Sequence, residues 1–254
     1  MTDWSRLSDA FAHAARIHAL QRRKGTDIPY VSHLMAVAGL VLEHGGDEDL
    51  AIAALLHDAI EDCGAEQEAE IASRFGQRIA AIVRDCTDAD VQPKPPWRAR
   101  KEAYLAHLPH KGRDSLLVSA ADKLHNARAI VADLRTHGPA MMTRFNAGAK
   151  GTLWYYRALA DAYARLLPGA LARELALAVD EMERLAAGRG GRPRLVWRHA
   201  AGGRAAAPDR SHGRRRRAPP ARAAAPSRRP GIPTRRPAPR TASHSAGAAR
   251  SRRS

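Results

Sequence analysis

The chain has 254 residues, a formal net charge of +16 and only two cysteines, Cys63 and Cys86. This length can bury a core without disulfide bonds, and two cysteines are too few for a disulfide framework, so a small disulfide-stapled scaffold is excluded. No apolar run reaches the roughly 18 residues of a membrane-spanning helix, and the N-terminus lacks the apolar segment of a secretory signal, so we expect a cytoplasmic protein without a membrane partner.

The positive charge is confined to the C-terminal part of the chain. Residues 188–254 hold 19 of the 42 basic residues and one of the 26 acidic residues, which leaves 23 basic and 25 acidic residues in 1–187. The same segment holds nine of the 16 prolines, and its only apolar cluster is LVW at 195–197. So little apolar surface cannot offset the entropy lost on ordering. We therefore predict a folded domain at 1–187 and a disordered basic tail at 188–254.

Residues 1–187 are rich in alanine and leucine at helical spacing and contain no segment with the alternation of a strand. Glycine and proline clusters such as HGGDED at 44–49 and VQPKPP at 91–96 separate the helical segments. The expected helices are, in chain order, 3–23, 32–43, 48–62, 66–75, 77–87, 96–108, 114–134, 140–146, 152–166 and 170–187. We predict an all-α fold.

The stretch LLHDAIEDCG at 55–64 places four titratable residues in an otherwise apolar helix. His57 and Asp58 are followed four residues later by Glu61 and Asp62, so the two pairs would lie on adjoining rows of one helix surface. Neighbouring helix positions point about 100° apart, so His57 and Asp58 can serve one site only if both side chains converge on a common point. A divalent metal is such a point, and a solvent-exposed pair is the alternative.

Two further candidate ligands lie in similarly apolar surroundings, His33 in YVSHLMAVAGLV and Asp122 in LLVSAADKLHNARAI. A buried carboxylate is expensive unless it is paired or binds a metal, so the alternative for Asp122 is a salt bridge to Lys123 or Arg128. The alternative for His33 is a hydrogen-bonded core histidine. Two histidines and two aspartates form a mixed nitrogen and oxygen set that suits manganese, iron, zinc or magnesium.

Three segments, QRRKGTDIPYVSH, AALLHDAIEDCG and SAADKLHNAR, together resemble the HD-superfamily hydrolase domain of the RelA/SpoT alarmone enzymes, and most of all the small alarmone hydrolases. The resemblance covers roughly residues 5–185. It implies an HD-superfamily helical bundle that hydrolyses (p)ppGpp at the 3′-diphosphate, giving GDP or GTP and pyrophosphate. It also implies one metal cofactor, usually manganese, whose ligands are His33, His57, Asp58 and Asp122.

The resemblance assigns roles to five more residues. It implies that Glu61 and Asp62 serve the attacking water and the leaving group, that Arg23 and Lys24 meet the phosphates of the substrate, and that Asn126 contacts the nucleotide. The charges agree with this, because a substrate with two pyrophosphate groups needs cations near the metal. A metal also lowers the pKa of water, so that Glu61 or Asp62 could relay a proton near neutral pH.

Two positions depart from the family pattern and leave the choice of substrate open. Leu20 stands where relatives commonly have a glycine, and Ala129 stands where many have a hydroxyl residue. An HD phosphohydrolase acting on another nucleotide, such as NADPH or a dNTP, is therefore an alternative. A third possibility is non-specific nucleic-acid binding by the tail, whose RRRR at 214–217 could neutralise phosphates. The oligomeric state is left open.

Overall fold

The computed structural model describes residues 4–87 and 95–188, which lie within one compact unit, Met1–Trp197. Helices dominate this part of the chain, and its only β-type pairing is an isolated bridge between Arg22 and Pro29. The all-α prediction is confirmed. No helix in the described ranges is long and apolar enough to cross a membrane. The predicted tail lies, apart from Gly188, outside the described residues, so its disorder and the domain boundary stay predictions.

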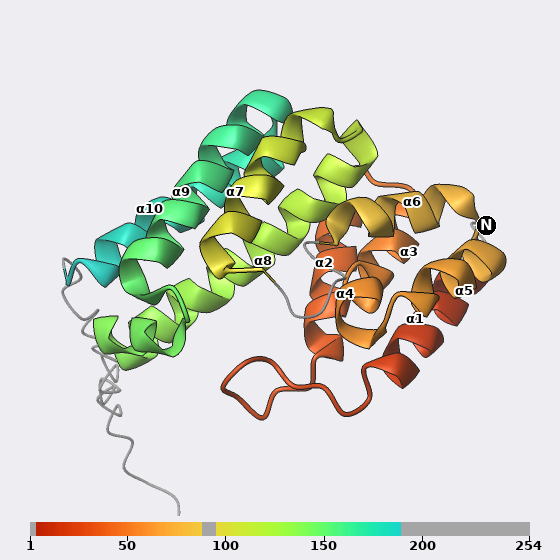
Figure 1. The fold of residues 1–254 in the computed structure, drawn as a ribbon, viewed down its shortest axis with the longest axis horizontal. Coiled ribbons are helices and arrows are strands. Elements are labelled where there is room, and N and C mark those ends of the chain that lie inside the picture. Colours follow the sequence, from red (N-terminus) through yellow and green to blue (C-terminus); the bar gives the residue numbers. More distant parts are fainter. Residues whose placement is uncertain (1–3, 88–94, 189–254) are drawn as a thin grey trace, which may run out of the picture. The chain divides into compact units, whose positions relative to one another are not determined.

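The described helices fall into two groups along the chain (Figure 1). The first group is α1 (Ser5–Ile17), α2 (Val31–Glu43), α3 (Glu48–Leu56), α4 (Ala59–Cys63), α5 (Glu66–Phe75) and α6 (Gln77–Cys86). The second is α7 (Trp97–His107), α8 (Arg113–His137), α9 (Gly148–Leu166) and α10 (Ala170–Ala186), with the 3-10 turns η1 (Leu108–His110) and η2 (Pro139–Arg144).

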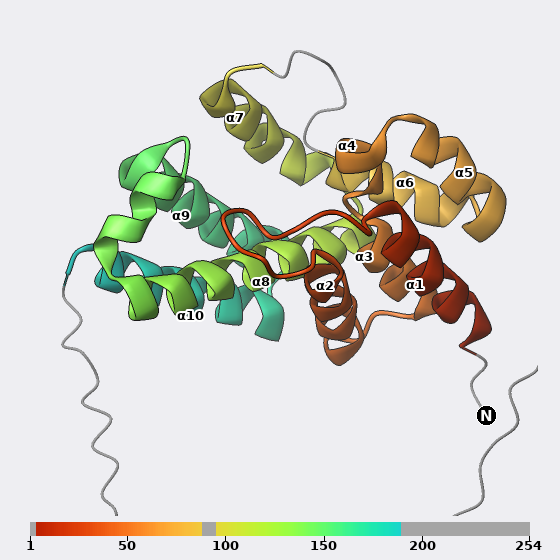
Figure 2. The ribbon, with the colours of Figure 1, turned by 90° about the horizontal axis from the view of Figure 1, so that it is seen from below.

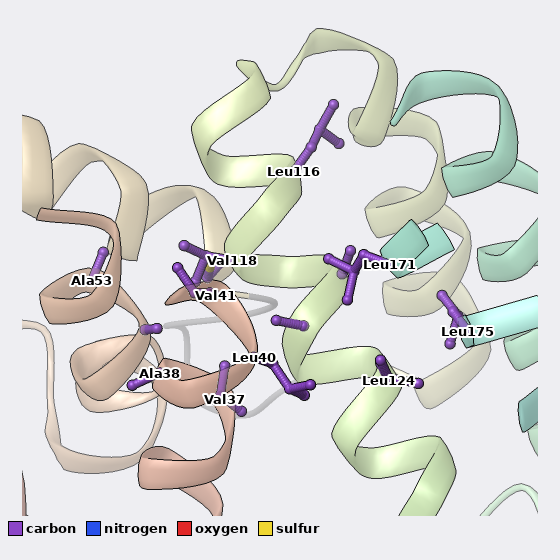
Figure 3. Packing of buried hydrophobic residues seen from close by; sticks show 14 of the residues in the cluster. Val37, Ala38, Leu40, Val41, Ala53, Leu116, Val118, Leu124, Leu171 and Leu175 are labelled. Carbon is purple, nitrogen blue, oxygen red and sulfur yellow. The ribbon is translucent and has the colours of Figure 1, made fainter. Parts of the chain in front are cut away.

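Helix α8 belongs to the second group and packs against both groups (Figures 1 and 2). It contacts α2, α3 and α6 on one side and α9, α10 and η2 on the other. Its 25 residues span about 37 Å. Figure 3 shows buried apolar side chains of α2 and α10 approaching α8, among them Val41 and Leu175. Asp122 lies near the middle of α8 and is therefore carried into the core, where it is 5% exposed.

The predicted helix 3–23 is too long, because α1 ends at Ile17. Residues 18–30 form a loop, which we call the α1–α2 loop, that hydrogen-bonds to itself: the Tyr30 amide donates to the Gln21 carbonyl (3.0 Å) and the Arg23 amide to the Ile28 carbonyl (2.9 Å). Gly25, with φ of +73°, supports the turn between these pairs. The loop crosses α8 in Figure 2, and its Arg23 donates a hydrogen bond to Asn126 of that helix at 2.8 Å.

The predicted helix 48–62 is broken. Helix α3 ends at Leu56 and α4 begins at Ala59, so His57 and Asp58 form a turn between them. Neither a glycine nor a proline stands at this break, so nothing in the local sequence signals it. The predicted helix 140–146 is likewise replaced by η2, a 3-10 helix.

Candidate metal centre and adjoining cavities

Four side chains from α2, α8 and the α3–α4 turn converge on one point. The His33 Nε2 atom lies 3.2 Å from Asp122 Oδ1 and 3.7 Å from Asp58 Oδ2. The His57 Nε2 atom lies 3.0 Å from Asp58 Oδ2 and 3.6 Å from Asp122 Oδ1. The ligand atoms of His33, His57 and Asp58 all lie within 4.8 Å of one another. The structure thus brings together the four residues that we predicted as metal ligands, and we call them the buried cluster.

The two imidazoles of the buried cluster direct their Nε2 atoms toward its carboxylates. The His57 Nδ1 atom lies 2.8 Å from the carbonyl oxygen of Ala54, which can only accept, so Nδ1 carries a hydrogen and Nε2 is the atom that a metal could take. The Nε2 atoms of His33 and His57 are buried and have no hydrogen-bond partner. A divalent cation would satisfy both atoms, and mixed imidazole and carboxylate donors suit such a cation. The residues present therefore fit a divalent metal.

The two carboxylates of the buried cluster are held in place by neighbouring donors. The Tyr30 hydroxyl donates to Asp58 Oδ2 at 2.5 Å. On α8, the Lys123 ammonium donates to Asp122 Oδ2 at 2.6 Å and the Asn126 amide donates to Asp122 Oδ1 at 2.5 Å. Such outer contacts fix the orientation of metal ligands in proteins.

One of the two salt bridges that we considered as the alternative for Asp122 is present. Lys123 pairs with Asp122, whereas Arg128 pairs with Glu174 of α10. The His33 Nδ1 atom meets His125 Nδ1 at 2.7 Å, so His33 also has an outer partner.

The charges around the buried cluster keep both carboxylates ionised. Burial alone would raise the pKa of Asp58, but the neighbouring His57 lowers it below the ordinary value. Burial would likewise raise the pKa of Asp122, but Lys123 and then the two histidines hold it well below its ordinary value. The pKa of His33 is lowered, chiefly by burial, whereas the two carboxylates raise the pKa of His57 against the effect of burial. Both carboxylates are therefore ionised, which is the form in which they could bind a cation.

Asp62 lies next to this cluster and is held from the α1–α2 loop. The Gln21 side-chain amide donates to Asp62 Oδ2 at 2.8 Å, while Gln21 Oε1 lies 2.6 Å from Nδ1 of the buried His18. Partial desolvation and, next, the negative charge of Asp58 raise the pKa of Asp62. This brings its protonation closer to neutral pH.

A cavity of about 420 Å³ opens beside the buried cluster, and we call it the basic cleft. The charged residues of its lining are one acid, Glu61, and four bases, Lys24, Arg100, Lys101 and Lys123. Sequence reasoning missed Arg100 and Lys101 of α7, because nothing in the sequence places α7 next to the metal motifs. A cleft with this excess of positive charge suits an anion such as a phosphate.

A second cavity of about 290 Å³, the Asp133 pocket, shares five lining residues with the basic cleft. They are Lys24, Asn126, Ile130, Phe145 and Tyr156. Arg23 also lines this pocket and donates to Asn126 Oδ1 at 2.8 Å. The two cavities therefore adjoin each other. They also adjoin the buried cluster, because Tyr30, Lys123 and Asn126 of their linings donate to Asp58 or Asp122.

The two departures from the family pattern have different places relative to these cavities. Ala129 lines the Asp133 pocket, whereas the Leu20 side chain is 93% exposed and lines neither cavity. Sequence reasoning also missed Tyr30 and His125. Each stands three positions from a predicted ligand, Tyr30 before His33 and His125 after Asp122, and this helical spacing is the signal that could have found them.

Comparison with known proteins gives one family and several relatives. The HD-domain family profile matches residues 10–147. The guanosine-3′,5′-bis(diphosphate) 3′-pyrophosphohydrolase MESH1 of Xenopus tropicalis is 39% identical over 130 residues, 50% of this chain and 70% of the relative. Its namesake in Danio rerio is 38% identical over 125 residues, 48% of this chain and 67% of the relative.

The fold also matches a solved structure, described as a metazoan ortholog of SpoT that hydrolyses ppGpp. The match has a TM-score of 0.59 and 25% sequence identity, and covers 75% of this chain and 98% of the other.

Proposed function

The chain belongs to the HD-domain family and is related to the MESH1 pyrophosphohydrolases, and from this premise we propose that it hydrolyses (p)ppGpp at the 3′-diphosphate, releasing pyrophosphate and GDP or GTP. One observation carries the proposal: two imidazoles and two carboxylates meet beside a cavity that four bases line. That arrangement supports a site for a metal and a polyphosphate together.

His33, His57, Asp58 and Asp122 would hold the divalent cation, for which we propose manganese. When bound there, a divalent cation polarises phosphoryl oxygens and lowers the pKa of water. The outer contacts from Tyr30 and Asn126 keep the carboxylates in position, so that the charge of the site is fixed before the substrate arrives.

The reaction requires two proton transfers. A water oxygen bonds to the phosphorus next to the ribose, that phosphorus releases the ribose 3′-oxygen, and this oxygen gains a proton while the water loses one. Glu61 lines the basic cleft and Asp62 lies beside the buried cluster with a raised pKa. These positions support Glu61 and Asp62 as the groups that accept and donate the protons.

The bases of the cleft hold the rest of the substrate. Lys24 lines both cavities and Arg23 reaches Asn126, so each stands where a phosphate near the ribose would pass. Charge-assisted hydrogen bonds from such side chains orient a phosphate, and orientation lowers the barrier because the reacting atoms start close to the productive geometry.

The test is phosphorus NMR of the full chain incubated with ppGpp and manganese, with a chelator-treated sample as the control. We expect pyrophosphate and GDP to appear only with the metal. A folded, manganese-loaded protein that leaves ppGpp intact would refute the proposal. The same assay with NADPH and a panel of dNTPs would then identify an HD phosphohydrolase with another substrate, for which the departure at Ala129 in the Asp133 pocket is the first place to look.

A further inference from the structure

The Asp133 pocket contains a carboxylate without a protein partner. Asp133 is half-buried and is the only acidic residue in the lining of this pocket. Within the described ranges 4–87 and 95–188 it makes no hydrogen bond and no ion pair with another residue, although Arg23 and Lys24 line the same pocket. A carboxylate that is partly withdrawn from water usually has a partner, so this one is suited to a ligand that supplies hydrogen-bond donors.

We propose that Asp133 binds the Watson–Crick edge of guanine and thereby selects a guanine nucleotide over an adenine nucleotide. The inference rests on the proposed function, because it takes the Asp133 pocket as the base end of the cleft whose phosphate end is the metal centre. The inference goes beyond the proposed reaction, because that reaction does not determine the role of Asp133 or how guanine is distinguished from adenine.

The register of α8 connects the two ends of the cleft. Asp122, Asn126, Ala129 and Asp133 stand at positions i, i+4, i+7 and i+11, which lie along one face of a helix. Asp133 is therefore about 16 Å along α8 from Asp122. A nucleoside with a phosphate on its ribose is an elongated ligand, and this spacing lets its phosphate lie at the buried cluster while its base reaches Asp133.

The charges of the cleft orient such a ligand in one direction. The basic cleft holds four bases against one acid, whereas the Asp133 pocket holds two bases against Asp133, so the phosphates are drawn more strongly to the basic cleft. The walls between the two ends include apolar and aromatic side chains, among them Ile28, Tyr30, Phe145 and Tyr156. Flat apolar walls suit a purine ring. Ala129 contributes only a methyl group and leaves the α8 side of the pocket open.

The chemistry of the two purines makes the carboxylate selective. Guanine presents two parallel donors, N1–H and the 2-amino group, which match the two oxygens of a carboxylate. Adenine presents one donor, the 6-amino group, next to the lone pair of N1, which would face the carboxylate unfavourably. A site built to accept hydrogen bonds from a ligand rejects an analogue that lacks the donors, because its buried acceptor is then unpaired.

The test compares ppGpp with its adenosine counterpart ppApp, using the full chain loaded with manganese. We expect the wild type to prefer ppGpp in kcat/KM by roughly 10- to 100-fold, the discrimination of a good bidentate contact to a base. Asp133→Asn and Asp133→Ala should each remove most of this preference, chiefly by slowing ppGpp, and should leave the bound manganese unchanged. Asp161→Asn, an exposed carboxylate of α9 outside both cavities, is the matched control and should keep the wild-type ratio.

Calorimetric binding of GDP, IDP and ADP to the same variants separates this inference from the proposed function. IDP lacks the 2-amino group, so we expect wild-type affinity to fall from GDP through IDP to ADP, and the differences to shrink in Asp133→Asn. A wild type without a guanine preference, or an Asp133→Asn variant that keeps it, would overturn the inference even if ppGpp is hydrolysed. If ppGpp is not hydrolysed but GDP binding still depends on Asp133, the proposed reaction is wrong and the base selection stands.

Discussion

Two clusters of charged residues, one buried and one exposed, each connect α8 with residues in or beside α3. The buried cluster is His33, His57, Asp58 and Asp122, with side chains 1% to 20% exposed. The exposed cluster is Arg78 with Asp47, Asp49 and Asp114, with side chains 25% to 56% exposed. In the exposed cluster one guanidinium donates to all three carboxylates. In the buried cluster two imidazole nitrogens have no hydrogen-bond partner.

This difference indicates that the exposed cluster has a structural role and the buried cluster a functional one. Exposed ion pairs contribute little to stability and place no demand on a ligand, because water and the partner charges satisfy every group. Buried polar groups that lack hydrogen-bond partners lower the stability of a protein. Proteins keep such groups mainly where a functional site requires them. We therefore expect substitutions in the buried cluster to act on activity, and substitutions in the exposed cluster to act on stability alone.

The largest expected effect comes from matched exchanges of aspartate for asparagine in the two clusters. Asp58→Asn should abolish metal-dependent turnover and lower the bound manganese, because it removes a negative ligand from the centre. Asp114→Asn in the exposed cluster should leave both unchanged. Phosphorus NMR and metal analysis of the purified proteins provide the measurements. Normal turnover in Asp58→Asn would contradict the assignment of the buried cluster as the metal centre.

Glu61→Gln separates a loss of catalysis from a loss of metal, because Glu61 lines the basic cleft and is not one of the predicted metal ligands. We expect kcat to fall by roughly 100-fold or more, the loss typical of a missing general acid or base, while manganese content stays near the wild-type value. Glu43→Gln at the exposed end of α2 is the control. Loss of metal from Glu61→Gln would instead make Glu61 a ligand.

Gln21→Leu tests a contact at the edge of the buried cluster. Removing the side-chain amide that donates to Asp62 should misplace this carboxylate and lower kcat on the order of tenfold, with KM and manganese content little changed. Gln77→Leu, on the exposed surface of α6, is the matched control and should keep the wild-type kcat. Equal activity of the two variants would show that Asp62 needs no support from the α1–α2 loop.

The smallest effect is expected in the exposed cluster. Asp47 accepts a hydrogen bond from the Leu50 amide at the start of α3 (2.9 Å), so Asp47→Ala should lower the free energy of unfolding by about 1 kcal/mol at neutral pH and leave kcat unchanged. Burial alone would raise the pKa of Asp47, but the Leu50 amide and Arg78 lower it.

A carboxylate with a lowered pKa in the folded state stabilises the fold fully above its unfolded pKa of about 3.9, and this contribution is lost as the pH falls through the folded value. The difference between wild type and Asp47→Ala in urea unfolding should therefore shrink in acid. A difference that grows in acid would show that the stabilising contact does not depend on the charged carboxylate.

Much of the fold could be read from the sequence, and the errors have one kind of cause. The segments 66–75 and 170–187 match α5 and α10 almost to the residue, because their apolar spacing and flanking glycines are local signals. The segment 3–23 failed after Ile17, since the hydrogen bonds of the α1–α2 loop outweigh a helical pattern there. The segment 48–62 failed at His57 and Asp58, where no local breaker is present.

The sequence by itself determined that the chain forms an all-α domain, because residue type and helical spacing suffice for that. Its three motifs resemble the HD family, and that resemblance named the four side chains that could share a metal. Only the tertiary structure decided how those side chains meet. Neighbouring positions of one straight helix diverge by about 100°, whereas the turn at His57 and Asp58 brings His57 Nε2 within 3.0 Å of Asp58 Oδ2 and 3.6 Å of Asp122 Oδ1. The tertiary structure also decided that α7 supplies bases to the cleft and that Asp133 shares a pocket with Arg23. These contacts join residues far apart in the chain, and no local pattern encodes the distance between them.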